Sequence, residues 1–196
     1  MQILDKKLKA LAAKDSAKIL VVSDSHGQPS NLRTALNAHG TSCDALVFAG
    51  DGIADLLSIM EEDCSSPAES KILPQVVIFV RGNGDSACYS FFDGTLKTVQ
   101  VPEQAVFTAA GQKFFVTHGN FFGVSFSTQE LLEHLEKNRF NAGIFGHTHI
   151  PFAQYKKDIL LFNPGSTSRP RGNSKKSYGV LTVSREKIDW QFFEIF

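Results

Sequence analysis

The stretch Gly146-His147-Thr148-His149 lies late in the chain, between an apolar run and a proline. Residues two apart in an extended segment project to the same face, so both histidines can reach one metal cluster. Alone, an H-x-H pair is often only the polar face of a strand. The interpretation as a metal site is supported by four earlier apolar runs that each end in potential metal ligands, namely Ser23-Asp24-Ser25-His26-Gly27, Ala49-Gly50-Asp51-Gly52, Arg81-Gly82-Asn83-Gly84-Asp85 and Thr117-His118-Gly119. Five strand ends are therefore expected to converge on one place.

Strand and helix patterns alternate in the first half of the chain and give way to closely spaced strands in the second. The sequence predicts strands at 19–22, 45–49, 76–80, 96–101, 105–109, 113–117, 142–145, 159–162, 179–183 and 188–193. It predicts helices at 29–38, 53–62 and 127–138, and a loop at 63–70. Early βα units followed by antiparallel strands indicate an α/β sandwich of two sheets with helices outside.

Composition excludes several classes of protein. At 196 residues and 42% hydrophobic, the chain can bury a large core as a single domain. Lys plus Arg and Asp plus Glu are 20 each, which argues against a nucleic-acid partner. No apolar run approaches the roughly 20 residues of a membrane span, so we expect no membrane segment. The charged N-terminus does not resemble a secretory signal, and the cytoplasm is the predicted location.

The N-terminal residues 3–14 show helical spacing of apolar residues, including Ile3, Leu4, Leu8 and Leu11, among lysines. We therefore predict an amphipathic helical extension at residues 1–18, ahead of one domain at 19–196. The three cysteines, Cys43, Cys64 and Cys88, are odd in number and unpatterned, and we interpret them as reduced packing residues.

The ligand types indicate which metals the motifs suit. Aspartate and histidine with one asparagine, and without cysteine, form an oxygen and nitrogen site for Mn²⁺, Fe, Zn²⁺ or Mg²⁺ rather than Cu(I) or an iron-sulfur cluster. Seven protein ligands exceed what one ion uses, so we predict two ions that share a carboxylate, with Asp51 as the bridge. The candidate ligands are Asp24, His26, Asp51, Asn83, His118, His147 and His149.

In this order, D-x-H, G-D, G-N, H-G and G-H-T-H resemble the motifs of the calcineurin-like metallophosphoesterase superfamily. With Asn163-Pro164-Gly165-Ser166, the spacing resembles its small one-domain bacterial and archaeal phosphodiesterase branch, over nearly the whole chain from Ile19. The resemblance implies a four-layer α/β/β/α sandwich of two mixed sheets flanked by helices, with the ions at the strand ends. It assigns one ion to Asp24, His26 and His149, the other to Asn83, His118 and His147, and the bridge to Asp51.

The resemblance also implies a reaction. Two ions about 3.5 to 4 Å apart activate a water for in-line attack on the phosphorus of a small phosphate ester, most simply a diester. We expect Mn²⁺ first among the cofactors, with Ni²⁺, Zn²⁺, Fe or Mg²⁺ as alternatives. The expected catalytic residues are Asp51, Asn83 and His118, with Asn83 also able to orient the phosphate.

Two positions depart from the pattern. Many relatives carry His, and small phosphodiesterases often Cys, where this chain has Gly84, and relatives often read His-Gly-His where it has Asn120. Protonation of the leaving group is thus unassigned, and we expect weak turnover of alkyl esters and better turnover of activated aryl diesters. Asp85 could be a partner of a histidine, take the role of the missing proton donor, or be a turn carboxylate.

Other interpretations stay open at this point. The same fold resembles the metallophosphoesterase-like subunit of the retromer complex, so a weak or inactive protein-binding scaffold is the main alternative, followed by a phosphomonoesterase or a nuclease. The pairs Phe91-Phe92 and Phe121-Phe122 could be core, wall a pocket or form a surface between copies of the chain. His39 and His134 are expected to be solvated and not catalytic. The basic residues that follow the Asn163 motif either hold phosphate or are solvated, namely Arg169, Arg171, Lys175 and Lys176.

Overall fold

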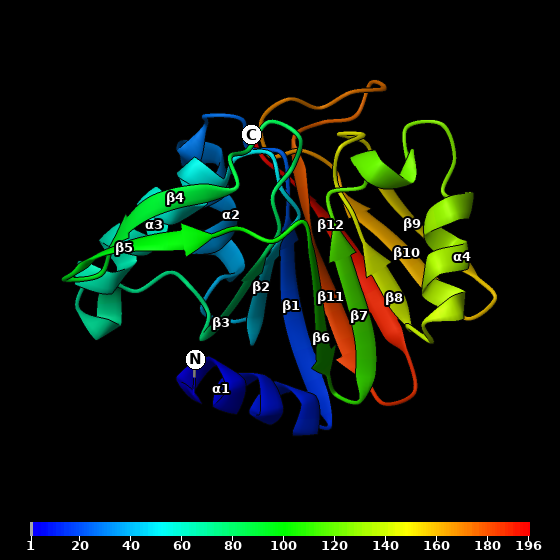
Figure 1. Ribbon diagram of the computed structural model, residues 1–196, viewed down its shortest axis with the longest axis horizontal. Coiled ribbons are helices and arrows are strands. Elements are labelled where there is room, and N and C mark those ends of the chain that lie inside the picture. The colour runs from blue at the N-terminus through cyan, green and yellow to red at the C-terminus, as the bar shows by residue number, and fades with distance from the viewer. Residues whose placement is uncertain (1) are drawn as a thin grey trace.

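Two five-stranded sheets face each other in the computed structural model, which describes residues 2–196, with side chains from Asp5 onward (Figure 1). The first sheet has the order β12-β11-β1-β2-β3. Its strands are β1 (Ser16–Val22), β2 (Ala45–Phe48), β3 (Val76–Phe79), β11 (Ser177–Ser184) and β12 (Ile188–Glu194). Strands β1, β2 and β3 are parallel, whereas β11 is antiparallel to both β1 and β12, so this sheet is mixed.

The second sheet has the order β6-β7-β8-β10-β9 and is also mixed. Its strands are β6 (Gln104–Ala109), β7 (Gln112–Thr117), β8 (Ala142–Ile144), β9 (Pro151–Lys156) and β10 (Ile159–Pro164). The central strands β7, β8 and β10 are parallel, and the edge strands β6 and β9 pair antiparallel. A separate hairpin of β4 (Cys88–Phe92) and β5 (Leu96–Gln100) projects beside the sandwich (Figure 1).

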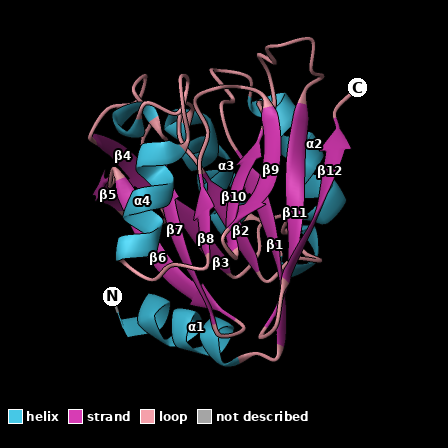
Figure 2. Cartoon of the chain, turned by 90° about the vertical axis from the view of Figure 1, so that its right-hand side faces the viewer, coloured by secondary structure: helices cyan, strands magenta, loops and turns pink. Residues whose placement is uncertain are grey.

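Helices cover the outer face of each sheet (Figures 1 and 2). Helices α2 (Pro29–His39) and α3 (Ile53–Ser65) pack on the first sheet, and α4 (Gln129–Lys137) packs on the second. This is the predicted four-layer α/β/β/α sandwich. Helix α1 (Gln2–Ala13) instead packs against β6 and β3 at one end of the sheets. The sequence predicted Ile3 and Leu4 on the apolar face of this helix, and their side chains lie outside the described residues. Within residues 2–196 no helix has the length and apolarity to cross a membrane.

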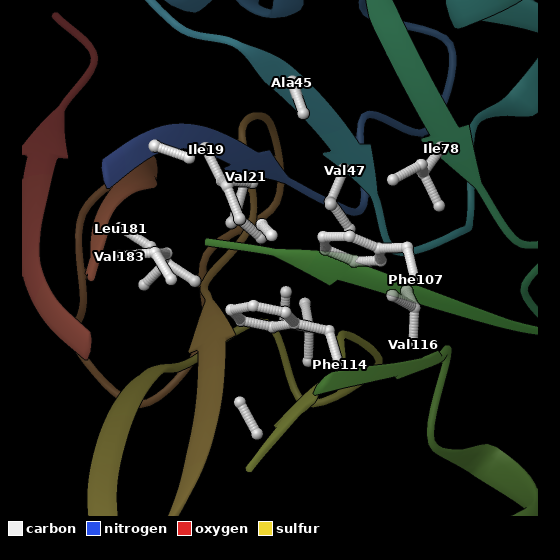
Figure 3. Close-up of a cluster of buried hydrophobic side chains, with 14 of the residues drawn as sticks. Ile19, Val21, Ala45, Val47, Ile78, Phe107, Phe114, Val116, Leu181 and Val183 are labelled. Atoms are coloured by element: carbon white, nitrogen blue, oxygen red, sulfur yellow. The ribbon is translucent and has the colours of Figure 1, made fainter. Parts of the chain in front are cut away.

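Alternating side chains of the strands fill different apolar cores. In β1, Ile19 and Val21 point between the two sheets, where Phe114 of β7 also packs (Figure 3). Leu20 and Val22 point the other way, into the core beneath α2 and α3. A strand with apolar partners on both faces needs no polar alternation, and this explains the continuous apolar runs in the sequence.

The phenylalanine pairs are divided between core and surface. Within β7, Phe114 and Phe115 face opposite cores, as expected for adjacent residues of a doubly covered sheet. Outside the sandwich strands, each of the other two pairs has one buried and one exposed member, Phe91 with Phe92 (53% exposed) and Phe122 with Phe121 (66% exposed). A core role therefore applies to one member of each pair, and only the other is available to a pocket or an interface.

Three expectations about secondary structure were wrong. Residues 63–70 are not one loop, because α3 continues to Ser65 and a short 3-10 helix, η1 (Ala68–Ser70), follows. The hydroxyls of Ser65 and Ser66 donate to carbonyl groups one turn earlier and so satisfy the polar end of α3. Strands β4 and β9 were missed because most of their side chains are exposed or half-buried, which leaves no apolar run to detect.

Two histidines and two cysteines also differ from expectation. His39 is half-buried, with its Nδ1 3.0 Å from the hydroxyl of Tyr178. His134 is half-buried among aromatic rings, so neither histidine is simply solvated. All three cysteines are free thiols in the described chain, but Cys64 and Cys88 are exposed and only the third is a packing residue.

Candidate metal centre

The loops that follow β1, β2, β7 and β8 are joined by backbone hydrogen bonds at one end of the sandwich. The N–H of Asp24 donates to the carbonyl of Gly50 (2.9 Å), and the N–H of His26 donates to the carbonyl of Asp51 (3.1 Å). Across the second sheet, the N–H of Gly146 donates to the carbonyl of His118 (3.0 Å). These bonds tie the motif loops to one another, so the side chains that they carry converge.

Left-handed backbone conformations are concentrated among the candidate ligands. Asp24, His26, Asp51, His147 and His149 all have positive φ, between 44° and 66°. A non-glycine residue in this region is uncommon and costs on the order of 1–3 kcal/mol, and such residues cluster at functional sites. The fold therefore maintains an unfavourable backbone at five of the seven predicted ligands, and this turns their side chains toward one place.

The first group of ligand atoms comes from Asp24, His26 and His149. Nδ1 of His149 lies 2.6 Å from the carbonyl oxygen of Arg169, which can only accept, so Nδ1 carries the proton and Nε2 has a lone pair. That Nε2 lies 3.1 Å from Nε2 of His26 and 3.1 Å from Oδ1 of Asp24. Oδ1 of Asp24 is buried and has no hydrogen-bond donor among the described residues. The lone pairs of His149 Nε2 and Asp24 Oδ1 therefore face one another.

The second group of ligand atoms comes from Asp24, Asp51 and His118, so Asp24 belongs to both groups, and His147 lies beside His118. Nδ1 of His118 donates to the carbonyl of Ala49 (2.8 Å), which leaves Nε2 free to act as a ligand. Nε2 of His118 lies 3.3 Å from Nδ1 of His147 and 3.5 Å from Oδ2 of Asp51. The same Oδ2 lies 3.7 Å from Nε2 of His26, a member of the first group. The Asp51 carboxylate thus lies between histidines of both groups.

Electrostatics in this cluster favour a cation. Burial raises the pKa of Asp51, but the hydrogen bond and charge of His118, with the N–H of Gly84, outweigh it and lower the pKa to about 2. Burial lowers the pKa of His118, whereas the carboxylates of Asp51 and Asp24 raise it, and the net shift is upward. Burial also lowers the pKa of His26 and His147, which keeps these imidazoles neutral. A field that attracts a proton to His118 also attracts a metal ion.

Asn83, the remaining predicted ligand, lies in the turn after β3, and its side chain is exposed. The N–H of the next residue, Gly84, donates to Oδ1 of Asp51 (2.7 Å). The turn that carries Asn83 is therefore fixed to the Asp51 carboxylate. No hydrogen bond of the Asn83 side chain itself is recorded in the described structure, so its role as a ligand stays a prediction.

Polar groups behind the ligands hold their loops, and the sequence did not assign these roles. The carboxylate of Asp85 accepts four backbone N–H groups, those of Asp51 (2.7 Å), Gly52, Ile53 and Gly82 (2.9 Å each). Asp85 is thus a loop-fixing carboxylate rather than a partner of a histidine. Three further side chains support the loops in the same way, and they are Asp55, Asn163 and Ser166.

A cavity of about 280 Å³ opens beside the ligands. Its lining includes His26, Asp51, Gly84, Asp85, Tyr89 and Arg169. A larger cavity of about 940 Å³ lies between α1 and the segments that precede β2 and β3, and none of the seven candidate ligands lines it. We place the functional site at the smaller cavity, because the converging lone pairs are there.

The residues present fit divalent metal ions. Nε2 of His149 and the buried Oδ1 of Asp24 approach to 3.1 Å, although neither atom carries a proton for a hydrogen bond between them. Oxygen and imidazole nitrogen are the donors that Mn²⁺, Fe and Zn²⁺ accept. Backbone carbonyl groups fix the orientation of two of the imidazoles, as is usual for metal-ligating histidines.

Comparisons with known proteins give concordant matches. The model of the calcineurin-like phosphoesterase superfamily domain matches residues 17–186. Phosphodiesterase YfcE of Escherichia coli (strain K12) is 34% identical over 171 residues, 84% of this chain and 86% of YfcE. The probable metallophosphoesterase YsnB of Bacillus subtilis is 28% identical over 176 residues, 90% of each chain. A crystal structure of a predicted phosphoesterase from Streptococcus pneumoniae covers 94% of this chain and 95% of its own, with 25% identity and a TM-score of 0.69. Sequence, fold and ligand geometry thus lead to one conclusion, that the chain belongs to the calcineurin-like phosphoesterase superfamily.

Proposed function

We propose that this protein is a phosphodiesterase that holds two divalent metal ions with its seven motif residues. The observation that carries the proposal is the position of the Asp51 carboxylate, whose Oδ2 lies 3.7 Å from His26 and 3.5 Å from His118. One carboxylate between two sets of imidazoles is the arrangement that a bridging ligand requires. The 34% identity to a protein named a phosphodiesterase supports a diester as substrate.

In this proposal each part of the site has one task. When bound, two divalent ions lower the pKa of a water and polarise the phosphoryl oxygens for in-line attack on phosphorus. Asp24, His26 and His149 would hold one ion, and Asn83, His118 and His147 the other, with Asp51 shared. The Asn83 amide, exposed in its turn, would also orient the phosphate. Asp85 keeps Asp51 in place through the backbone N–H groups that it accepts.

Arg169 is the cationic side chain in the wall of the cavity. Burial is the main influence that lowers the pKa of His26, and the charge of Arg169 acts in the same direction, so the guanidinium lies close to the site. Arg169 takes part in none of the ion pairs found among the described side chains. An arginine without a carboxylate partner at the rim of this cavity suits a phosphate oxygen.

The variant Arg169→Gln tests this assignment. We expect KM for bis(p-nitrophenyl) phosphate to rise about tenfold, the value of one charge-assisted hydrogen bond, with a smaller change in kcat. Arg185→Gln is the matched control, because Arg185 is exposed and pairs with Asp15. Steady-state kinetics with saturating metal measure both variants. Equal KM values for Arg169→Gln and Arg185→Gln would remove Arg169 from the phosphate site.

The function itself is tested with metal-stripped protein. Mn²⁺, Ni²⁺, Zn²⁺ and Mg²⁺ are added back singly, and hydrolysis of bis(p-nitrophenyl) phosphate is compared with hydrolysis of p-nitrophenyl phosphate. We expect metal-dependent cleavage that favours the diester. Preference for the monoester would make the protein a phosphomonoesterase. Stoichiometric metal binding without cleavage of either ester would favour the scaffold, with the exposed Phe92 and Phe121 as the first surfaces to test.

Three finer points belong to the same proposal. We expect Mn²⁺ to give the highest turnover, which the metal series above measures. A cytoplasmic location is supported by three free cysteines in a chain that needs no disulfide. We also propose a helical extension at 1–18 ahead of one domain at 19–196; the family match starts near this boundary, at residue 17, whereas β1 already begins at Ser16.

A further inference from the structure

The cavity beside the ligands contains a proton donor that the sequence did not reveal. At the two positions where a donor was expected, the chain has Gly84 and Asn120. Tyr89 lines the same cavity as Gly84, His26 and Asp51. It comes from β4, a strand that the sequence did not predict, and this brings a phenol hydroxyl to the wall where Gly84 leaves no side chain.

The oxygen of the Tyr89 hydroxyl is fixed by a hydrogen bond from the backbone, and its proton is available to an acceptor in the cavity. The oxygen accepts the N–H of Ser86 at 2.9 Å. The proton points to Oδ1 of Asp85 at 3.5 Å, the long limit of a hydrogen bond. That Oδ1 already accepts the N–H groups of Gly52 and Ile53, at 2.9 Å each. An acceptor inside the cavity that lies closer than 3.5 Å to the Tyr89 hydroxyl would therefore replace Asp85 as its hydrogen-bond partner with little loss of stability.

The ring of Tyr89 is fixed by the fold. Tyr89 pairs with Val99 across the β4–β5 hairpin, and it is half-buried against the core that lies beneath α2 and α3. The neighbouring Phe91 is buried in the same core and anchors the strand. A donor on an ordered strand keeps its direction during the reaction, which general acid catalysis requires.

We propose that Tyr89 is the catalytic residue that protonates the leaving oxygen of the diester. The inference rests on the proposed phosphodiesterase function. As the attacking water oxygen bonds to phosphorus and the bond to the leaving oxygen breaks, that oxygen keeps the bonding electron pair and takes the proton from Oη. The N–H of Ser86 then stabilises the phenolate. The phenolate regains a proton from solvent, which replaces the one that the attacking water released, so the products are a monoester and an alcohol.

This assignment revises the expectation of weak turnover for poor leaving groups. That expectation followed from the lack of a proton donor at Gly84 and Asn120. With Tyr89 as the donor, weak turnover of poor leaving groups is expected only of a variant that lacks the Tyr89 hydroxyl. Phenols are much stronger acids than alkyl alcohols. A phenol can therefore protonate a departing alkoxide or phenoxide, whereas a 4-nitrophenoxide departs without help.

The test compares Tyr89→Phe with wild type on two diesters that differ only in the leaving group, methyl phenyl phosphate and methyl 4-nitrophenyl phosphate. We expect kcat for methyl phenyl phosphate to fall about 100-fold and kcat for the nitrophenyl ester to change by about threefold or less. Tyr155→Phe is the matched control, because its hydroxyl donates to the carbonyl of Ile188 and it does not line this cavity. It should change neither rate.

Two readouts besides activity separate catalysis from structure. Tyr89→Phe should keep the same number of bound ions per chain and the same affinity for dimethylphosphinate, an analogue that has no ester bond to hydrolyse. Wild type alone supplies a further check, since its rates across methyl aryl phosphates should depend only weakly on leaving-group basicity. A steep dependence in wild type, or an equal fall on both esters in Tyr89→Phe, would overturn the assignment while metal-dependent diesterase activity remained. If wild type cleaves neither ester, the proposed function fails as well.

Discussion

Replacing Asp51 with asparagine is expected to lower kcat/KM for a diester by more than about 100-fold. Loss of a residue that only hydrogen-bonds to a metal ligand usually costs about 10- to 100-fold, and Asp51 is proposed as a ligand itself. Asparagine has nearly the same shape, but it replaces one carboxylate oxygen with an amide N–H₂. That amide would donate to the Nε2 lone pair of His118, now 3.5 Å from Oδ2, and so compete with an ion for this nitrogen. We also expect at least one of the two ions to be lost, measured by elemental analysis after gel filtration.

Asp63→Asn is a suitable control for Asp51→Asn. Asp63 is half-buried, and its Oδ1 also accepts backbone N–H groups, from Ile72 and Leu73, outside the site. The control therefore removes one negative charge from a comparable environment without touching a ligand. Full turnover with both ions retained in Asp51→Asn would remove Asp51 as the bridge.

The second large effect is expected from Gly82→Ala. A Cβ at Gly82 would overlap Oδ1 of Asp51 and would lie 2.6 Å from the Asp51 backbone nitrogen. Neither atom can withdraw easily, because that nitrogen donates to Asp85 and Oδ1 accepts the N–H of Gly84. We expect loss of metal affinity and of most activity, with destabilisation of about 1–3 kcal/mol, the usual cost of overpacking.

Gly84→Ala provides the comparison for Gly82→Ala within the same turn. Its Cβ would lie 3.2 Å from Oδ1 of Asp51, a contact that a few tenths of an ångström of movement relieves. Gly84→Ala should therefore keep at least about tenfold more activity than Gly82→Ala, because only Gly82→Ala must displace the carboxylate. Isothermal titration with Mn²⁺ and thermal unfolding measure both variants. Equal effects would show that Asp51 tolerates displacement and is not held in a fixed position.

The sequence indicated which motif side chains would lie close together, because their positions depend on local rules, and their roles as ligands stay a prediction. Each candidate ligand follows a buried strand, and parallel strands of one sheet deliver their carboxyl ends to one edge. The pair Asp24 and His26 could be recognised from spacing alone. Their left-handed backbone could not, because nothing in the sequence shows that both residues have positive φ.

Residues that act across long sequence separations escaped prediction. Asp85 fixes N–H groups 32 to 34 residues earlier in the chain, so its sequence neighbours do not reveal its role. Tyr89 was missed because β4 has mostly exposed or half-buried side chains and no apolar run, which hid the strand that carries it. Arg169 was noticed only as one of several basic residues, since the sequence does not show which of them faces the cavity.

The central claim, two ions sharing the Asp51 carboxylate, is tested most directly by anomalous X-ray scattering from crystals grown with Mn²⁺. The account predicts two peaks about 3.5 to 4 Å apart. One peak should be bound by Asp24, His26 and His149, the other by Asn83, His118 and His147, and Asp51 should contact both. A single peak at full occupancy under excess Mn²⁺, or two peaks with Asp51 bound to only one of them, would contradict it.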